Sequence, residues 1–190
     1  MQATAGDFQR GRAPEHAAQK KHVAVLQGEV AVVQLEREPE EGVVVSSDRA
    51  TTCVVLVAHC ASSQRALVAH LDSIDRHVCD DLRGCFSQLR NPNVFLVGAY
   101  TDSNGTGRQL LGELAGFLHD GVALEIHLQL FCCGALNTDA QNQPIAQGLA
   151  YCTSTCTPYV PSPGAMYPGK CSNSPASFSP TPHLVPTGCR

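Results

Sequence analysis

The chain has 190 residues, of which 43% are hydrophobic and 16% charged, with a formal net charge of −4. These proportions are ordinary for a soluble globular protein with one core, and the absence of a basic block argues against nucleic-acid binding. No apolar run is long enough to span a bilayer, and the N-terminus lacks the apolar core of a secretory signal. We therefore expect neither nucleic acid nor a membrane as a partner.

The ten cysteines do not form a metal-binding pattern. Without a signal peptide, we expect reduced thiols rather than a disulfide framework. No C-x-x-C spacing occurs, since Cys152 and Cys156 are four residues apart and Cys132 and Cys133 are adjacent. This spacing argues against a structural zinc site, and Cys132 and Cys133 are better explained as core residues.

Strands dominate the first part of the predicted structure. Residues 1–20 are small and polar, which predicts a disordered segment. Valine-rich or continuous apolar runs then predict strands at 22–34 (with a break at Gly28), 42–47, 53–59 and 66–71. The run 53–59 has no polar alternation, so we expect it to be buried on both faces and to form a hairpin with 66–71.

Helical periodicity appears after residue 71. Apolar residues from Ile74 to Leu89 recur every three or four positions, with Asp72 or Ser73 as the predicted N-cap and Asn91-Pro92 as the stop. A second amphipathic helix is predicted around 110–118 and ends near Gly121. Further strands are predicted at 93–99, at 122–130 (where apolar residues alternate strictly and His127 falls on the polar side) and at 145–151.

This order of elements predicts an α/β (α+β) domain, a layered mixed β-sheet sandwich with helices packed on it. We expect the domain to occupy residues 21–156. Eight of the twelve prolines fall among the last 34 residues, so 157–190 is predicted to be a disordered Pro/Ser-rich tail.

Cys53 stands where a polar, turn-like stretch becomes an apolar strand. A thiol at the end of a strand can meet a substrate, and it becomes a useful nucleophile when a base lies close by. His70 lies on the returning strand, and Ser47 precedes Cys53 by six residues and can orient the imidazole. Together they supply the nucleophile, base and orienting group of a thiol-dependent acyl-transfer site.

The spacing by itself leaves other interpretations open. A Cys, a His and a Ser within 24 residues arise by chance in many chains, and Cys53 can be an ordinary core thiol. His59 and Cys60 carry the same functional groups and can equally be named from the spacing.

A resemblance to a known family favours the first interpretation. "DRATTCVVLV" followed by "LVAHLDS" resembles the active-site region of the protein N-terminal asparagine amidohydrolase family, in a plant- or algal-like form. There, too, Ala-Thr-Thr-Cys precedes an apolar strand, and His-x-Asp follows at the same separation of 17 residues. The likeness extends over about residues 22–161. The family continues beyond this point, so we expect a C-terminally truncated member, and position 99 is Ala where the family usually has Gly.

The resemblance implies conversion of N-terminal asparagine to aspartate with release of ammonia, without metal or cofactor. It assigns Cys53 as nucleophile, His70 as base and Ser47 as the residue that orients His70. Asp48 and Asp72 are candidates for binding the substrate's α-ammonium group, although a turn and a helix N-cap explain them equally well.

The same pattern is similar to that of the chemoreceptor glutamine deamidases, which share a layered α/β fold. Deamidation of internal Gln or Asn side chains, or an inactive binding module, are therefore the alternatives. The resemblance also implies protein or peptide substrates that begin with Asn, and a place in the N-degron pathway of ubiquitin-dependent degradation. We further expect a monomer in the cytoplasm and also in the nucleus.

Overall fold

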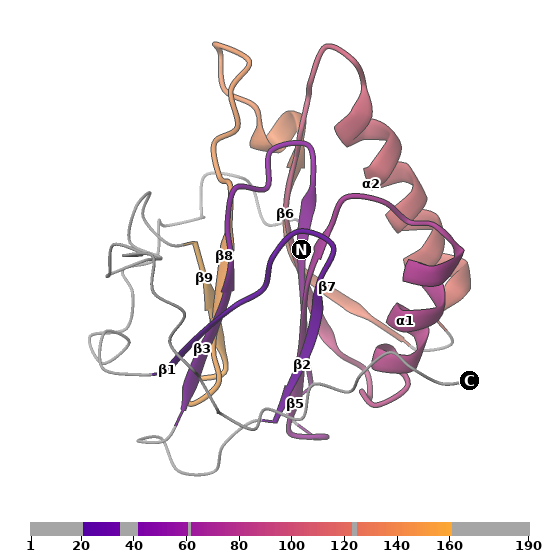
Figure 1. Ribbon diagram of the computed structural model, residues 1–190, viewed down its shortest axis with the longest axis vertical. Coiled ribbons are helices and arrows are strands. Elements are labelled where there is room, and N and C mark those ends of the chain that lie inside the picture. The colour runs from indigo at the N-terminus through magenta and orange to yellow at the C-terminus, as the bar shows by residue number, and fades with distance from the viewer. Residues whose placement is uncertain (1–20, 35–41, 61, 123–124, 161–190) are drawn as a thin grey trace, which may run out of the picture.

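The computed structural model describes residues 21–34, 42–60, 62–122 and 125–160, and the predicted N-terminal segment and all but the first residues of the predicted tail lie outside them. The described residues form three layers (Figure 1). A small sheet lies on one side, a larger sheet lies in the middle, and two helices cover the far face of the larger sheet. The predicted α/β layered sandwich is therefore confirmed.

Both sheets mix parallel and antiparallel neighbours. The small sheet has the order β1 (Lys21–Ala24), β3 (Val43–Ser47), β8 (Leu149–Cys152) and β9 (Thr157–Tyr159). The larger sheet has the order β2 (Val30–Gln34), β5 (Arg65–Leu71), β4 (Val54–Cys60), β6 (Asn93–Tyr100) and β7 (His127–Gly134). The pairs β1–β3 and β6–β7 are parallel, and the other pairs are antiparallel.

β4 is the centre of the molecule, and every one of its residues is buried. Alternate side chains of a strand point to opposite faces of the sheet. Val54 and Leu56 accordingly pack in the core beneath the helices, whereas Val55 and Val57 pack in the core between the two sheets. Two apolar layers explain why the predicted run was continuous rather than alternating.

The first helix begins later than predicted. α1 covers Arg76–Phe86, and its N-cap is Asp75, whose carboxylate accepts a hydrogen bond from the Val78 amide at 3.0 Å. The predicted caps Asp72 and Ser73 lie before it, so that prediction was wrong. Asp75 is as suitable an N-cap residue as Asp72. The point at which β5 ends decides which of the two carboxylates lies at the start of the helix.

The second helix and the strand after it also differ in detail from the prediction. α2 covers Thr106–Gly116 and continues as a π-helical turn, Phe117–Gly121. β7 begins only at His127, so the alternation predicted from residue 122 does not describe the strand, and Leu128 is 53% exposed. The reason is that β7 lies at the sheet edge, where its register with β6 is irregular. His127 is exposed and Cys132 and Cys133 are buried, as predicted.

The valine-rich segment after residue 21 divides between the two sheets. Gly28 has φ +78°, and the turn 25–29 carries the chain from β1 in the small sheet to β2 in the larger one. Thr157–Tyr159, the first residues of the predicted tail, form β9 and pair with β8. Among the described residues, no helix is both long and apolar enough to cross a membrane.

Gly98 allows β6 to approach β4 beside Cys53. Its φ is +127°, and a Cβ at this position would overlap the carbonyl oxygen of Cys53. The next residue, Ala99, donates a backbone hydrogen bond to that same oxygen at 2.7 Å and also has a positive φ of 43°. Gly98 is therefore required by both its conformation and its surroundings.

We expect Gly98→Ala to destabilise the protein by about 3 kcal/mol, because strain and overpacking act together. The matched control is Gly84→Ala, in the interior of α1, where an added Cβ meets nothing within 4 Å. That change should stabilise the protein by about 0.5–1 kcal/mol. Chemical denaturation of both variants checks this prediction, and equal stabilities would contradict the close approach of β6 to β4.

Candidate active site

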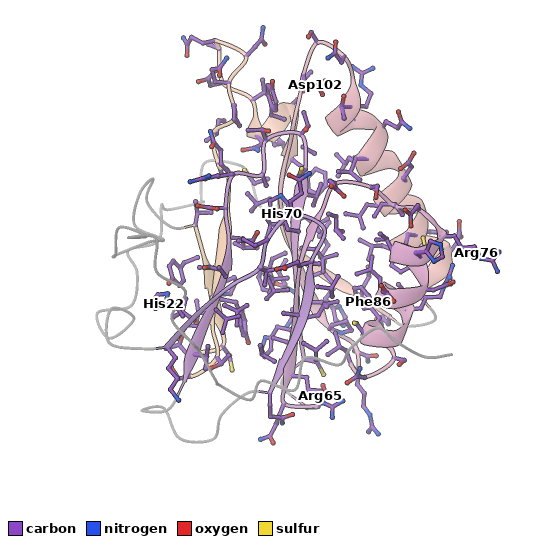
Figure 2. The ribbon with its side chains drawn as sticks, in the orientation of Figure 1. His22, Arg65, His70, Arg76, Phe86 and Asp102 are labelled. Carbon is purple, nitrogen blue, oxygen red and sulfur yellow. The ribbon has the colours of Figure 1, made fainter. Side chains whose placement is uncertain are left out.

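A hydrogen bond between the two sheets brings Ser47 and His70 together. Ser47 ends β3 in the small sheet, and His70 lies near the end of β5 in the larger sheet. The Ser47 Oγ and the His70 Nδ1 are 2.8 Å apart, and the two side chains are 1% and 4% exposed. Figure 2 shows His70 on the side of the larger sheet that faces the small sheet, with Phe86 on the helix side.

The hydrogen atoms available decide which imidazole nitrogen is the base. The Ser47 hydroxyl has one hydrogen and donates it to the carbonyl oxygen of Val25 at 2.7 Å. Ser47 must therefore accept the hydrogen bond from Nδ1–H of His70. The neutral imidazole then has its lone pair on Nε2, a buried atom with no hydrogen-bond partner among the described residues. This is the tautomer that a general base requires.

Cys53 lies on the same inner face as His70. It directly precedes β4 and packs in the core between the sheets with Val55, the residue that pairs with His70 across β4 and β5. Residues two positions apart on a strand share a face, so Cys53 is the diagonal neighbour of His70. Cys53 is 9% exposed, so it is largely but not completely shielded from solvent.

Burial keeps both groups neutral. Burial raises the pKa of the Cys53 thiol, and the negative charge of Asp72 raises it further, while a hydrogen bond from Thr52 acts in the opposite direction. Burial also lowers the pKa of His70, against the opposing effect of Asp72 and Asp48. At neutral pH the arrangement is a thiol beside a neutral imidazole, not a preformed thiolate–imidazolium pair.

The two predicted acidic residues both act on this site electrostatically. Asp48 follows Ser47 at the end of β3, and Asp72 follows β5 two residues after His70. Both charges influence the pKa of His70, but only Asp72 also influences that of Cys53. All five predicted site residues therefore gather at one end of the sandwich.

The turn 25–29 is a part of the site that sequence reasoning missed. Its backbone holds His70 in place, since Gly28 N–H donates to the His70 carbonyl at 2.8 Å and His70 N–H donates to the Glu29 carbonyl at 3.0 Å. Val25 receives the Ser47 hydrogen bond, and Gln27 Nε2 donates to Asp72 Oδ2 at 2.8 Å. The sequence signal for this turn is Gly28, which by itself predicts only a break in the strand.

A buried asparagine holds the opposite wall, and it too was missed. The Asn137 amide donates to the carbonyl oxygens of Gly98 and Ala146, at 3.1 and 2.9 Å, and its Oδ1 accepts from the Ala146 amide at 2.7 Å. Ala146 packs in the same core as Cys53. Asn137 therefore ties the segment after β7 to the residues that surround the thiol.

The alternatives named from spacing have different surroundings. His59 lies at the other end of β4, where its ring contacts Tyr151 with centroids 5.4 Å apart. Cys60 Sγ accepts backbone hydrogen bonds from Ser63 and Arg90, and these bonds, with its serine neighbours, lower its pKa to about 7 against the effect of burial. Cys60, not Cys53, is thus the more acidic thiol at rest, so acidity alone does not identify the nucleophile.

The fold and these residues define a class: a layered α/β protein with a thiol, an oriented imidazole and a hydroxyl on the inner face of its sandwich. The family model described as protein N-terminal asparagine amidohydrolase matches residues 12–171. The chain belongs to this family, whose members are hydrolases of amide C–N bonds. None of the curated proteins compared with it matches the chain.

Buried neutral histidines predict a loss of stability in acid. Burial lowers the pKa of His59 and His70, so the unfolded chain binds protons at a higher pH than the folded protein does. Their contribution to stability is therefore complete above about pH 6.5 and is lost as the pH falls through the lowered pKa values.

We expect His59→Phe to weaken this pH dependence, because phenylalanine keeps the ring contact with Tyr151 but does not titrate. The control is His77→Asn, at an exposed position of α1, which should retain the dependence of the native protein. The free energy of unfolding measured between pH 8 and pH 5 tests this. An unchanged pH dependence in the His59 variant would show that another group is responsible.

Proposed function

We propose that this protein converts the N-terminal asparagine of proteins and peptides to aspartate, with Cys53 as nucleophile. The family supports amidohydrolase activity toward N-terminal asparagine. The observation that carries the assignment of residues is the His70 imidazole, held by Ser47 so that its free Nε2 lies on the same face as the Cys53 thiol.

The first half of the reaction makes a thioester. Because thiol and imidazole are both neutral at rest, His70 Nε2 accepts the thiol proton as the sulfur attacks the side-chain carboxamide carbon. A carbon–sulfur bond forms, and the oxygen of the tetrahedral intermediate carries the negative charge. Backbone N–H groups at Cys53 are suited to stabilise it, and such a donor is worth about 3–4 kcal/mol in other enzymes. The carbon–nitrogen bond then breaks, and His70 gives its proton to the departing ammonia.

The second half regenerates the thiol. A water molecule attacks the thioester carbon as His70 Nε2 takes one of its protons. The carbon–sulfur bond breaks, His70 returns the proton to sulfur, and the side chain leaves as the carboxylic acid of aspartate, which then loses its remaining proton to solvent. Ser47 keeps the same imidazole nitrogen available in both halves, so one tautomer serves both steps.

Recognition of a free N-terminus requires an anion at the site mouth. Asp48 and Asp72 both influence His70 electrostatically, so both carboxylates are candidates to pair with the α-ammonium group of the substrate. Capping of α1 does not account for Asp72, since Asp75 caps that helix. Because the product is an N-terminal aspartate, we propose that the protein acts in the N-degron pathway. We also propose that it is a monomer of the cytoplasm and the nucleus.

We expect Cys53→Ser and His70→Ala each to lower kcat/KM by at least about a thousandfold, because each removes a group that takes part in both steps. The double change should cost little more than either single change, since the two residues act as a unit. Cys79→Ser, a half-buried thiol on α1, is the matched control. Ammonia release from an Asn-initiated peptide is the measurement, and near-normal turnover by His70→Ala would rule out its role as base.

We also expect N-terminal Asn to be preferred over N-terminal Gln and over acetylated Asn. An extra methylene costs a pocket about 1–3 kcal/mol and also moves the carbonyl away from a fixed thiol. Acetylation removes the charge that the acidic residues pair. The test is kcat/KM on three matched peptides. Equal values for Asn and acetyl-Asn would favour deamidation of internal side chains, and no turnover by a folded protein would favour a binding module.

A further inference from the structure

Gln27 and Asp72 meet at the protein surface beside the candidate site. Both side chains are exposed, 45 residues apart in the sequence, and joined by one hydrogen bond of 2.8 Å. The backbone of the same turn already holds His70 through Gly28 and Glu29. The Gln27 side chain gives the Asp72 carboxylate a fixed position.

That position lies beside the thiol. β4 and β5 pair Val55 with His70 and Val54 with Leu71, so continuing the register by one residue sets Cys53 opposite Asp72. Directly opposed positions of an antiparallel pair are close neighbours on one face. The charge of Asp72 disfavours the Cys53 thiolate, in agreement with this placement.

Asp48, unlike Asp72, does not influence both the imidazole and the thiol. It leaves the end of β3 in the small sheet, and its charge influences His70 but is not among the influences on Cys53. The α-ammonium group of an asparagine is only three bonds from the carbon under attack. The carboxylate that binds it must therefore lie near the thiol, a condition that Asp72 meets.

We propose that Asp72, positioned by Gln27, keeps Cys53 a poor nucleophile until the substrate's α-ammonium group binds beside it. The ammonium ion then neutralises the carboxylate, and the penalty on the developing thiolate disappears as the amide reaches the sulfur. Gln27 is a positioning residue in this arrangement, because it acts through Asp72. The inference rests on the proposed function for its substrate, but its effect on the thiol exists in the free protein.

The charged and titratable groups that bear on Cys53 and His70 come from several elements. They are Asp72 at the end of β5, Asp48 at the end of β3, and three residues that pack in or against the same core as Cys53, namely Cys132 of β7, Tyr151 of β8 and Cys156. Of these groups, Asp72 is the one that influences the Cys53 thiol through its charge and is held in position by a hydrogen bond from Gln27.

The experiment measures the rate of Cys53 alkylation by iodoacetamide across pH 6–10 in the folded protein without substrate, by peptide mass spectrometry that separates Cys53 from the other cysteines. We expect Asp72→Asn to raise the rate at pH 8 about fivefold, since it removes a nearby negative charge. Gln27→Ala should act in the same direction but less, because Asp72 is then free to swing into solvent. The double variant should match Asp72→Asn.

Matched controls come from α2, where Gln109 Nε2 donates to Glu113 Oε1 at 2.9 Å in a similarly exposed pair. Gln109→Ala and Glu113→Gln should leave the Cys53 rate unchanged, and Asp48→Asn should change it less than Asp72→Asn. An unchanged rate in Asp72→Asn, or additive effects of the Gln27 and Asp72 changes, would overturn the proposal.

A second readout uses matched Asn and acetyl-Asn peptides. In Asp72→Asn the ratio of kcat/KM for the Asn peptide to that for the acetyl-Asn peptide should fall at least about tenfold, with changes in both kcat and KM. Gln27→Ala should show part of that loss. A preference retained in full by Asp72→Asn would overturn the proposal. If the native protein turns over neither peptide, the proposed function fails, while the alkylation rates still decide whether Gln27 and Asp72 control the thiol.

Discussion

The hydrogen bond between Ser47 and His70 crosses from one sheet to the other, and the candidate site depends on it. Both groups are buried, and a buried polar group without a partner costs about 1–3 kcal/mol. The two sheets can therefore pack at this end only in the position that lets these side chains meet. The same contact selects the imidazole tautomer, because the hydroxyl hydrogen is already given to Val25.

The second constraint is the neutral state of the thiol and the imidazole. A preformed thiolate would be more reactive at rest, but it would also require a positive charge in a sheltered pocket between two apolar layers. Instead, burial suppresses both charges, and the reaction must create them when a substrate is present. A chain with eight free cysteines among the described residues would gain from such restraint, since a thiol that is reactive without substrate is prone to oxidation.

The walls of the site are built from segments that have little regular structure. The turn 25–29 and the segment around Asn137 hold backbone groups of His70 and Gly98 from opposite sides. Neither β4 nor β5 alone fixes the thiol relative to the imidazole, because the two residues are diagonal rather than opposed. Gly98 and the positive φ of Ala99 let β6 approach the Cys53 carbonyl, so a backbone hydrogen bond holds the thiol end of β4 although it lies at a strand terminus.

The sequence by itself determined the elements whose signals are local. The unbroken apolar run of β4, the hairpin to β5, the helical period of α1 and the change of character at Cys53 all follow from side-chain pattern. It also pointed to Cys53 and His70, which lie in the motif that resembles the family, and to Ser47, which directly precedes that motif. Their polar chemistry at the ends of strands was the physical reason to consider them.

Only the tertiary structure decided what depends on contacts between distant segments. The sequence predicted Asp72 or Ser73 as the N-cap of α1, but Asp75 caps it, because the end of β5 and not local propensity sets where α1 begins. Asp72 therefore lies near the thiol instead. The start of β7 depended on its pairing with β6, a partner that its own alternation does not specify. The roles of Gln27 and Asn137 were invisible in the sequence for the same reason. A single amide side chain has no periodicity, and its meaning comes entirely from the groups that folding places within 3 Å of it.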